Sequence, residues 1–370
     1  MEQKVENIES TTTLHSPSQI VPSQLASRVK PRILIVGIVQ WARQEVYLMS
    51  AKYEFEMCTA ENREQFIEFC REKYQGVVAI YRNNVISDRI GNFDEILISK
   101  LPDSVKFICY YGIDYDTIDI EACCKKKIMV SNTPEPVYNA TADTVMLLIL
   151  STCRNAFAAQ NNLRNGNWNF GLRRGINPNR KILGIYGMGG VGKVVAKKAY
   201  AFRMKIQYYS HSRLDIGTEA QLHAEYVPLD QFFRTSDIIS LDLPLRPDTK
   251  HIIGQEELSK MKRGVIIINA SAGGLIDEQA LVDALDSGQV ASAGLDVFEN
   301  ERSIQTSLLR RENVTLLPHI STFTRDTEYE MELLVLRNLQ SALSTGVLVN
   351  LVNKQNIEPS SELFTLTGGF

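Results

Sequence analysis

The chain has 370 residues, of which 44% are hydrophobic and 22% charged, and its formal net charge is −3. This length allows two domains, and the charge balance excludes the strongly basic surface that nucleic acid binding requires. No apolar run is long enough to span a membrane. The six cysteines show neither metal-site spacing nor the density of a disulfide scaffold, so we expect reduced thiols, no metal site and a cytoplasmic location.

In the first third of the chain, the composition and the apolar pattern predict a disordered tail followed by alternating strands and helices. Residues 1–30 are rich in Ser, Thr, Gln and Pro and lack apolar periodicity. Amphipathic stretches then separate short apolar runs, which is typical of β-α units. We expect strands over 32–37, 53–60, 76–81, 105–111 and 128–131, and helices over 62–73 and 140–165.

The stretch ILGIYGMGGVGK at 182–193 predicts a strand, a glycine turn and a helix. Gly187 permits a tight turn, Gly189 lets the backbone approach a pyrophosphate, and Gly192 allows close packing of helix on strand. The helix N-terminus would present free N–H groups to the phosphates. The predicted cofactor-binding residues of this turn are Gly187, Met188, Gly189, Gly190, Val191 and Gly192.

Apolar runs after the turn predict a complete doubly wound sheet. With 182–186 they make six strands, the others being 205–209, 238–241, 265–268, 293–295 and 314–317. A final helix over 326–345 follows a predicted hinge and should return to the first domain. We therefore predict an α/β protein of two Rossmann-like doubly wound domains. A dinucleotide-binding domain (139–324) is inserted into a flavodoxin-like substrate-binding domain (31–138 and 325–352), and 353–370 form a C-terminal tail.

Several ordered motifs identify a family resemblance that extends over roughly residues 32–350. They are GIDYDTID at 112–119, NTP at 132–134, ATADT at 140–144, LPLRPDTKHIIG at 243–254, GLIDEQAL at 274–281, GLDVFENE at 294–301 and LLPHIS at 316–321. The chain resembles the D-2-hydroxyacid dehydrogenases, and among them the glyoxylate and hydroxypyruvate reductases. The resemblance implies hydride transfer between a nicotinamide and a small 2-oxo or 2-hydroxy acid, commonly in a homodimer.

The resemblance also implies roles for individual residues. His319 matches the proton donor, and Glu301 matches the carboxylate that orients it, although Glu301 could also be a solvated loop residue. Asp296 matches the residue that binds the nicotinamide carboxamide. Tyr111 and Gly112 match the loop whose backbone N–H groups receive the substrate carboxylate.

One position departs from the family. The family places a substrate-binding arginine directly before a glycine, where this chain has Ala272 within INASAGGLIDE. A methyl group cannot grip a carboxylate or polarise a carbonyl as a guanidinium does, so we expect a loss of about 10²-fold in rate. Arg82, at the end of a first-domain strand, could reach the same site, or it could be a surface arginine.

The residues after 205–209 predict a preference for NADPH over NADH. NAD-selective members carry an acidic residue there for the ribose hydroxyls, and this chain has Ser210, His211, Ser212 and Arg213, which would accept a 2′-phosphate. Pro244 and Thr249 match positions on the adenosine and phosphate side, but each could simply form a turn.

The sequence therefore predicts an NADPH-dependent reductase of a small 2-oxo acid such as glyoxylate or hydroxypyruvate, with efficiency reduced at Ala272. The expected partners are the substrate and a second copy of the chain, without nucleic acid or membrane. A nicotinamide-binding regulatory or scaffold protein with impaired catalysis is the alternative.

Overall fold

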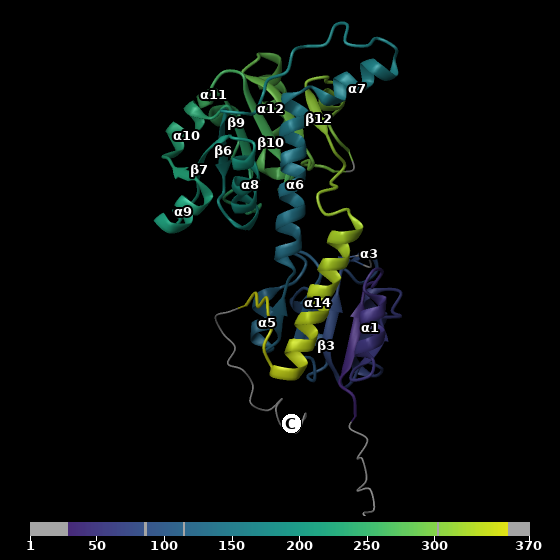
Figure 1. The fold of residues 1–370 in the computed structure, drawn as a ribbon. Helices are drawn as coiled ribbons and strands as arrows, with labels where there is room; N and C mark the ends of the chain where they lie inside the picture. The colour runs from purple at the N-terminus through teal and green to yellow at the C-terminus, as the bar shows by residue number, and fades with distance from the viewer. Residues whose placement is uncertain (1–28, 85–86, 114, 302, 354–370) are drawn as a thin grey trace, which may run out of the picture.

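The computed structural model describes residues 29–84, 87–113, 115–301 and 303–353, and the predicted tails at 1–30 and 353–370 lie almost wholly outside them. The described chain forms two lobes, each built on a parallel sheet covered by helices (Figure 1). The strand orders are β2-β1-β3-β4-β5 in the first sheet and β12-β11-β10-β9-β6-β7-β8 in the second. Both orders are those of doubly wound sheets, as predicted.

The first lobe follows the predicted β-α alternation. Its strands are β1 (Arg32–Val36), β2 (Glu54–Met57), β3 (Val77–Arg82), β4 (Phe107–Tyr110) and β5 (Met129–Ser131). Its helices are α1 (Arg43–Met49), α2 (Arg63–Arg71), α3 (Ser87–Ile90), α4 (Glu95–Lys100), α5 (Ile120–Lys125) and, from the end of the chain, α14 (Arg325–Thr345). The central strands are buried on both faces, which explains their continuous apolar runs.

The second lobe has one strand more than predicted. Its strands are β6 (Ile182–Tyr186), β7 (Lys205–Tyr209), β8 (Ala224–Tyr226), β9 (Ile238–Leu241), β10 (Val265–Asn269), β11 (Val290–Leu295) and β12 (Val314–Leu316). Its helices are α6 (Pro134–Cys153), α7 (Ala156–Arg164), α8 (Gly190–Ala201), α9 (Ile216–Leu222), α10 (Leu229–Thr235), α11 (Gln255–Lys260), α12 (Glu278–Asp286) and α13 (Thr306–Leu309), with a 3₁₀ turn at Gly273–Leu275. The sequence did not predict β8, because a three-residue edge strand leaves no periodic pattern.

The single long helix predicted over 140–165 is wrong in two respects. It begins earlier, because Pro134 suits the first turn of a helix, where its missing N–H is not needed. It is also broken into α6 and α7 at Asn155, whose backbone adopts the left-handed conformation (φ 50°). The chain beyond the break therefore leaves the axis of α6 (Figure 1).

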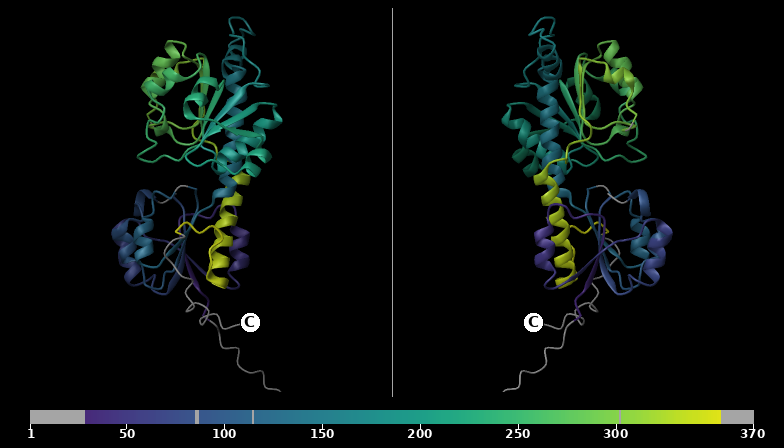
Figure 2. Two further views of the ribbon diagram at one scale, coloured as in Figure 1. Left: turned by 90° about the vertical axis from the view of Figure 1, so that its left-hand side faces the viewer. Right: turned by 90° about the vertical axis from the view of Figure 1, so that its right-hand side faces the viewer.

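The final helix, α14, returns to the first lobe, as predicted (Figure 2). Val335, Leu336 and Leu339 pack on the first sheet within one buried cluster. The buried carboxylate of Glu332 accepts hydrogen bonds from three backbone N–H groups before α1, those of Gln40 (2.8 Å), Trp41 (2.8 Å) and Ala42 (2.6 Å). These contacts fix the last helix to the first strand–helix connection.

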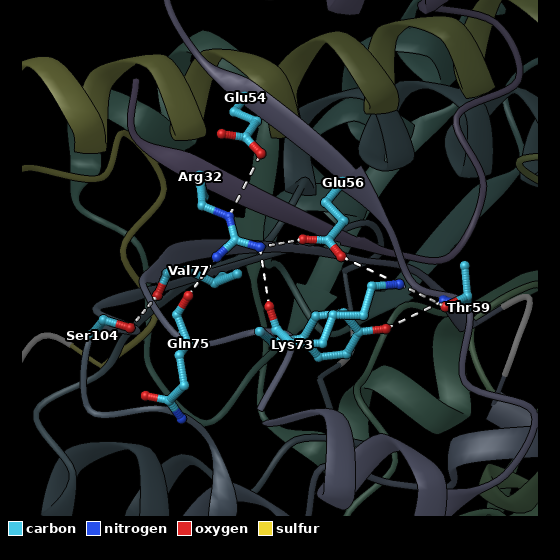
Figure 3. A network of polar contacts seen from close by, with 9 residues as sticks. Arg32, Glu54, Glu56, Thr59, Lys73, Gln75, Val77 and Ser104 are labelled. Carbon is cyan, nitrogen blue, oxygen red and sulfur yellow. Dashed lines mark hydrogen bonds and ion pairs between the residues drawn. The ribbon is translucent and has the colours of Figure 1, made fainter. Parts of the chain in front are cut away.

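A polar network lies at the edge of the first sheet that the amino ends of its strands form (Figure 3). Arg32 donates to the Glu56 carboxylate (2.6 Å) and to the Lys73 carbonyl (3.1 Å), and the Lys73 ammonium donates to Thr59 (3.0 Å). The network ties β1 and β2 to the chain that leads into β3. It lies at the edge opposite the carboxyl ends of the strands, so we assign it to local structure.

Candidate active site

The carboxyl ends of both sheets point toward the junction of the two lobes (Figures 1 and 2). In open parallel sheets, ligands bind at this edge, where the strand order reverses. In the second sheet the reversal lies between β6 and β9, which are hydrogen-bonded neighbours. The glycine turn follows β6 at this point, and Asp242 follows β9.

The geometry of the glycine turn fits a dinucleotide. Gly187 has a φ of 102°, and a Cβ atom there would lie 2.5 Å from the carbonyl oxygen of Asp242. A Cβ at Gly192 would lie 2.2 Å from the carbonyl oxygen of Gly187, whereas a Cβ at Gly189 would meet nothing within 4 Å. Gly189 caps α8 without a side-chain hydrogen bond. Open space and uncapped N–H groups at a helix start suit a pyrophosphate.

The other predicted residues of the turn, Met188, Val191 and Gly190, offer no polar side chain to a cofactor. Met188 and Val191 pack into the core, and Gly190 has no side chain. Met188 is buried, and Val191 is half-buried against the same cluster. Gly190 is the first residue of α8, and a Cβ there would overlap the ring of Tyr138 at 2.2 Å. A larger residue at 190 would therefore push α6 away from the turn.

At the predicted adenosine end, Arg213 is already paired. Its Nε and Nη2 donate to the two carboxylate oxygens of Glu219, each at 2.9 Å, and Glu219 also accepts from the Tyr208 hydroxyl at 2.7 Å. The hydrogen bond from Arg213 is the main cause that lowers the pKa of Glu219. Sequence reasoning missed Glu219, because nothing in its spacing marks it as the partner.

The structure brings His319 and Glu301 together, with 2.7 Å between His319 Nδ1 and Glu301 Oε1. Both side chains are about half exposed, so they are accessible to a ligand. His319 has a φ of 53°, and its N–H donates to the carbonyl of Asp296 at 2.8 Å. The predicted pair is therefore preformed, with Glu301 in the segment after β11 and His319 after β12.

Asp296 organises this histidine loop. Its fully buried carboxylate accepts from the N–H groups of Ile320 (2.8 Å) and Ser321 (3.0 Å) and from the Ser321 hydroxyl (2.5 Å). These bonds hold the chain beyond His319 in place. The predicted contact with a nicotinamide carboxamide would come in addition to this structural task.

The predicted substrate loop has its N–H groups engaged within the protein. Tyr111 donates to the Arg82 carbonyl at 2.8 Å, and Gly112 donates to the Thr133 hydroxyl at 2.9 Å. A substrate carboxylate must displace one of these partners or bind N–H groups further along the loop.

The loop that carries Ala272 is pinned by its backbone. The Asn269 amide donates to the Ala272 carbonyl at 2.8 Å, and the Ser271 hydroxyl donates to the Leu243 carbonyl at 2.6 Å. A Cβ at Gly273 would lie 1.9 Å from Phe298, so the glycine is required there. The backbone of this loop is therefore held at several points, and position 272 contributes only a methyl group.

Pro244 and Thr249 form one turn beside this loop. The buried Thr249 hydroxyl donates to the Pro244 carbonyl (2.8 Å) and accepts from the Arg246 N–H (2.7 Å). Next to the turn, His251 Nε2 lies 2.7 Å from Glu299 Oε1, a second histidine–carboxylate pair that the sequence did not single out.

Besides Asp296, two further buried charged groups stand at the carboxyl ends of strands. Arg82 is 0% exposed, so the alternative of a surface arginine is wrong. Asp242 is also buried, and neither of its carboxylate oxygens has a hydrogen-bond partner in the described part of the chain. Desolvation raises the pKa of Asp242 to about 7. The sequence signal for both is a charged residue that ends or follows an apolar strand.

All six cysteines are free, as expected. Among the residues that the structure describes, no group of three or more His, Cys, Asp or Glu side chains could hold a metal ion. The helices found between residues 29 and 353, outside the undescribed gaps, include none long and apolar enough to cross a membrane.

The doubly wound fold, the glycine turn and the histidine–carboxylate pair define a dinucleotide-dependent oxidoreductase. The sequence profile of the D-isomer specific 2-hydroxyacid dehydrogenase NAD-binding domain matches residues 146–321. The chain is 45% identical to 4-methyl-2-oxopentanoate reductase A of Aspergillus oryzae over 326 residues, 88% of this chain and 98% of that protein.

Solved structures agree. A glyoxylate reductase from Paecilomyes thermophila is 45% identical, with a TM-score of 0.82 over 88% of this chain and 99% of that one. An NADPH-dependent glyoxylate/hydroxypyruvate reductase from Sinorhizobium meliloti is 26% identical, with a TM-score of 0.76 over 90% and 100%. The chain belongs to the D-isomer specific 2-hydroxyacid dehydrogenase family, and it is an NAD(P)-dependent oxidoreductase that acts on CH–OH groups.

Proposed function

We propose that the chain is an NADPH-dependent reductase of a small 2-oxo acid of the glyoxylate or hydroxypyruvate type. The observation that carries the proposal is the preformed His319–Glu301 pair at the same sheet edge as the glycine turn. The names of the Aspergillus, Paecilomyes and Sinorhizobium relatives support the substrate class.

The residues divide the task as follows. The N–H groups at the start of α8 would hold the pyrophosphate, and the segment 210–213 would contact the adenosine ribose. The bound nicotinamide supplies the hydride. Because Nδ1 of His319 is engaged by Glu301, Nε2 is the nitrogen that gives a proton to the substrate carbonyl oxygen. The Glu301 carboxylate fixes the orientation of the imidazole ring.

The preference for NADPH rests on the residues at the adenosine end. No acidic side chain stands at 210–212 to repel a 2′-phosphate, and Arg213 follows directly. Glu219 neutralises part of that charge, since it engages Nε and Nη2 of the guanidinium. We therefore expect NADPH to bind more tightly than NADH by a modest factor, about 3- to 10-fold.

The test is purified protein with NADPH and a panel of 2-oxo acids, measured beside the Ala272→Arg variant. Turnover of glyoxylate or hydroxypyruvate by the wild type supports the proposal. The alternative, a nicotinamide-binding regulatory or scaffold protein, is favoured by the methyl group at position 272. A wild type that binds NADPH but turns over no 2-oxo acid, with an active variant, would establish that alternative.

We also propose a homodimer. The segment that follows the α6–α7 break exposes Leu163 (59%), Trp168 (72%) and Phe170 (86%), and a second copy could cover these side chains. Analytical ultracentrifugation tests this, and a monomer at micromolar concentration would contradict it.

A further inference from the structure

The guanidinium of Arg82 is a buried positive charge that forms no ion pair with any residue the structure describes. The side chain is 0% exposed and stacks 4.3 Å above the ring of Phe93. Its Nη2 has one long contact, 3.5 Å, with the carbonyl of Gly91, and Nε and Nη1 have no partner in the described chain. Burial lowers the pKa of Arg82 to about 10, so the group stays protonated at neutral pH.

Other arginines of the first lobe do not share this feature. Arg32 pairs with Glu56 at 2.6 Å, and Arg63 pairs with Asp94 at 2.5 Å. Burial of an unpaired cation opposes folding, because the lost hydration is not replaced. Stacking on an aromatic ring recovers only part of that loss. The fold alone gives no reason for a charge at this position.

The position of Arg82 supplies a reason. It is the last residue of β3, and its carbonyl accepts the N–H of Tyr111 in the predicted substrate loop. Tyr110 lies opposite it on β4, and the Tyr110 phenol partly offsets the lowering of the Arg82 pKa that burial causes. A Cβ at Gly112 would lie 3.2 Å from the Tyr110 hydroxyl. The Tyr110 ring therefore lies against Gly112, beside the strand end that carries Arg82.

We propose that Arg82 holds the substrate carboxylate electrostatically, from beneath the Tyr111–Gly112 loop, in place of the guanidinium that Ala272 lacks. The inference rests on the proposed 2-oxo acid function. Because Arg82 is fully buried, it acts through the loop and is a positioning residue rather than a contact. At an effective dielectric constant of about 20, one unit charge within about 10 Å changes the affinity for a monoanion by about tenfold or more.

The experiment compares three variants. Arg82→Met removes the charge but keeps an unbranched chain over Phe93, and Arg82→Lys keeps the charge. Arg63→Met is the matched control, because Arg63 donates to the carbonyls of Ile90 (3.2 Å) and Asn92 (2.8 Å) and so holds the same segment, with its charge already paired. Calorimetry on the NADPH-loaded full chain gives the Kd of oxamate, a carboxylate, and of oxamide, its uncharged counterpart.

We expect Arg82→Met to weaken oxamate binding about tenfold or more and to raise KM for a 2-oxo acid by a similar factor. Its kcat and its oxamide affinity should stay within about threefold of the wild type. Arg82→Lys and Arg63→Met should bind oxamate nearly as the wild type does, although Arg63→Met should lower the Tm.

Two results would overturn the inference alone: an active wild type with oxamate affinity unchanged in Arg82→Met, or equal losses for oxamate and oxamide. A wild type that binds NADPH but no oxamate would overturn the proposed function along with it.

Discussion

At the carboxyl edge of its sheet, each lobe buries a charged group with polar atoms that lack hydrogen-bond partners in the described chain. These groups, Arg82 in the first lobe and Asp242 in the second, behave differently. In the first lobe, Arg82 has a pKa lowered to about 10 and keeps its charge at neutral pH. In the second lobe, Asp242 has a pKa raised to about 7 and is largely neutral below that pH. The same cause, desolvation, moves both groups toward the uncharged form.

The difference follows from the ordinary pKa values and suits the two ligands. An arginine starts so far above neutrality that burial does not discharge it, whereas an aspartate is brought into the physiological range. A retained positive charge at the carboxyl edge of the first sheet would favour an anionic acid there, as proposed above. A suppressed negative charge beside Gly187 avoids repulsion of a pyrophosphate.

The largest expected effect concerns the proton donor between these two sides. His319→Gln should lower kcat by about 10²- to 10⁴-fold, because no group remains to protonate the carbonyl oxygen. NADPH affinity should stay within about twofold, measured by fluorescence titration. His251→Gln is the control, since His251 has the same 2.7 Å contact with a glutamate. A loss of less than tenfold in His319→Gln would rule out the assigned role.

Ala272→Arg should raise kcat/KM for a 2-oxo acid by about 10²-fold, because a guanidinium can both bind the carboxylate and polarise the carbonyl. Ala272→Met is the control for side-chain length. In the Ala272→Arg background, Arg82→Met should have a smaller effect than in the wild type, since the two charges would serve the same anion. Steady-state kinetics of the wild type, Ala272→Arg, Arg82→Met and the double variant measures this coupling. Strictly additive effects of the two substitutions on kcat/KM would contradict it.

Asp242→Asn tests the cofactor side through its pH dependence. The folded-state pKa of about 7 lies above the ordinary value of 3.8, so the folded protein keeps a proton that the unfolded chain has released. Stability is therefore lost as pH rises from about 4 to about 7. In urea denaturation, the free energy of unfolding of the variant should exceed that of the wild type by about 1–3 kcal/mol at pH 8. At pH 4 the two proteins should differ little in this free energy. An equal difference at both pH values would exclude titration of Asp242 as the cause.

The smallest effect is expected at the adenosine end. Glu219→Gln should raise the NADPH/NADH preference about 3- to 10-fold, because Arg213 would lose its bidentate partner and could turn to a 2′-phosphate. Gln can still accept from the Tyr208 hydroxyl, so the local fold should survive. The Kd for NADH divided by the Kd for NADPH measures this preference. A lower value in Glu219→Gln than in the wild type would argue against Arg213 as the phosphate ligand.

Local patterns in the sequence were sufficient for the strand, turn and helix around Gly187 and for the pairing of His319 with Glu301. The first is written in consecutive residues, and the second follows from ordered family motifs.

What the sequence could not show depends on packing between distant segments. The burial of Arg82 results from Phe93 and the chain around it, and the pairing of Arg213 depends on how α9 returns to β7. The break at Asn155 reflects a backbone conformation that asparagine tolerates but does not impose. Each of these modifies the chemistry of a site that the motifs only located.

The return of α14 to the first sheet has a consequence for biosynthesis. A ribosome delivers β1 to β5 first, yet Val335, Leu336 and Leu339, which cover one face of that sheet, emerge only after the entire second lobe. The first lobe is therefore completed last. The sheet face that α14 covers in the finished protein stays exposed while the second lobe is translated. Nascent chains stalled before residue 325 should bind chaperones through that face, and release should coincide with the synthesis of α14.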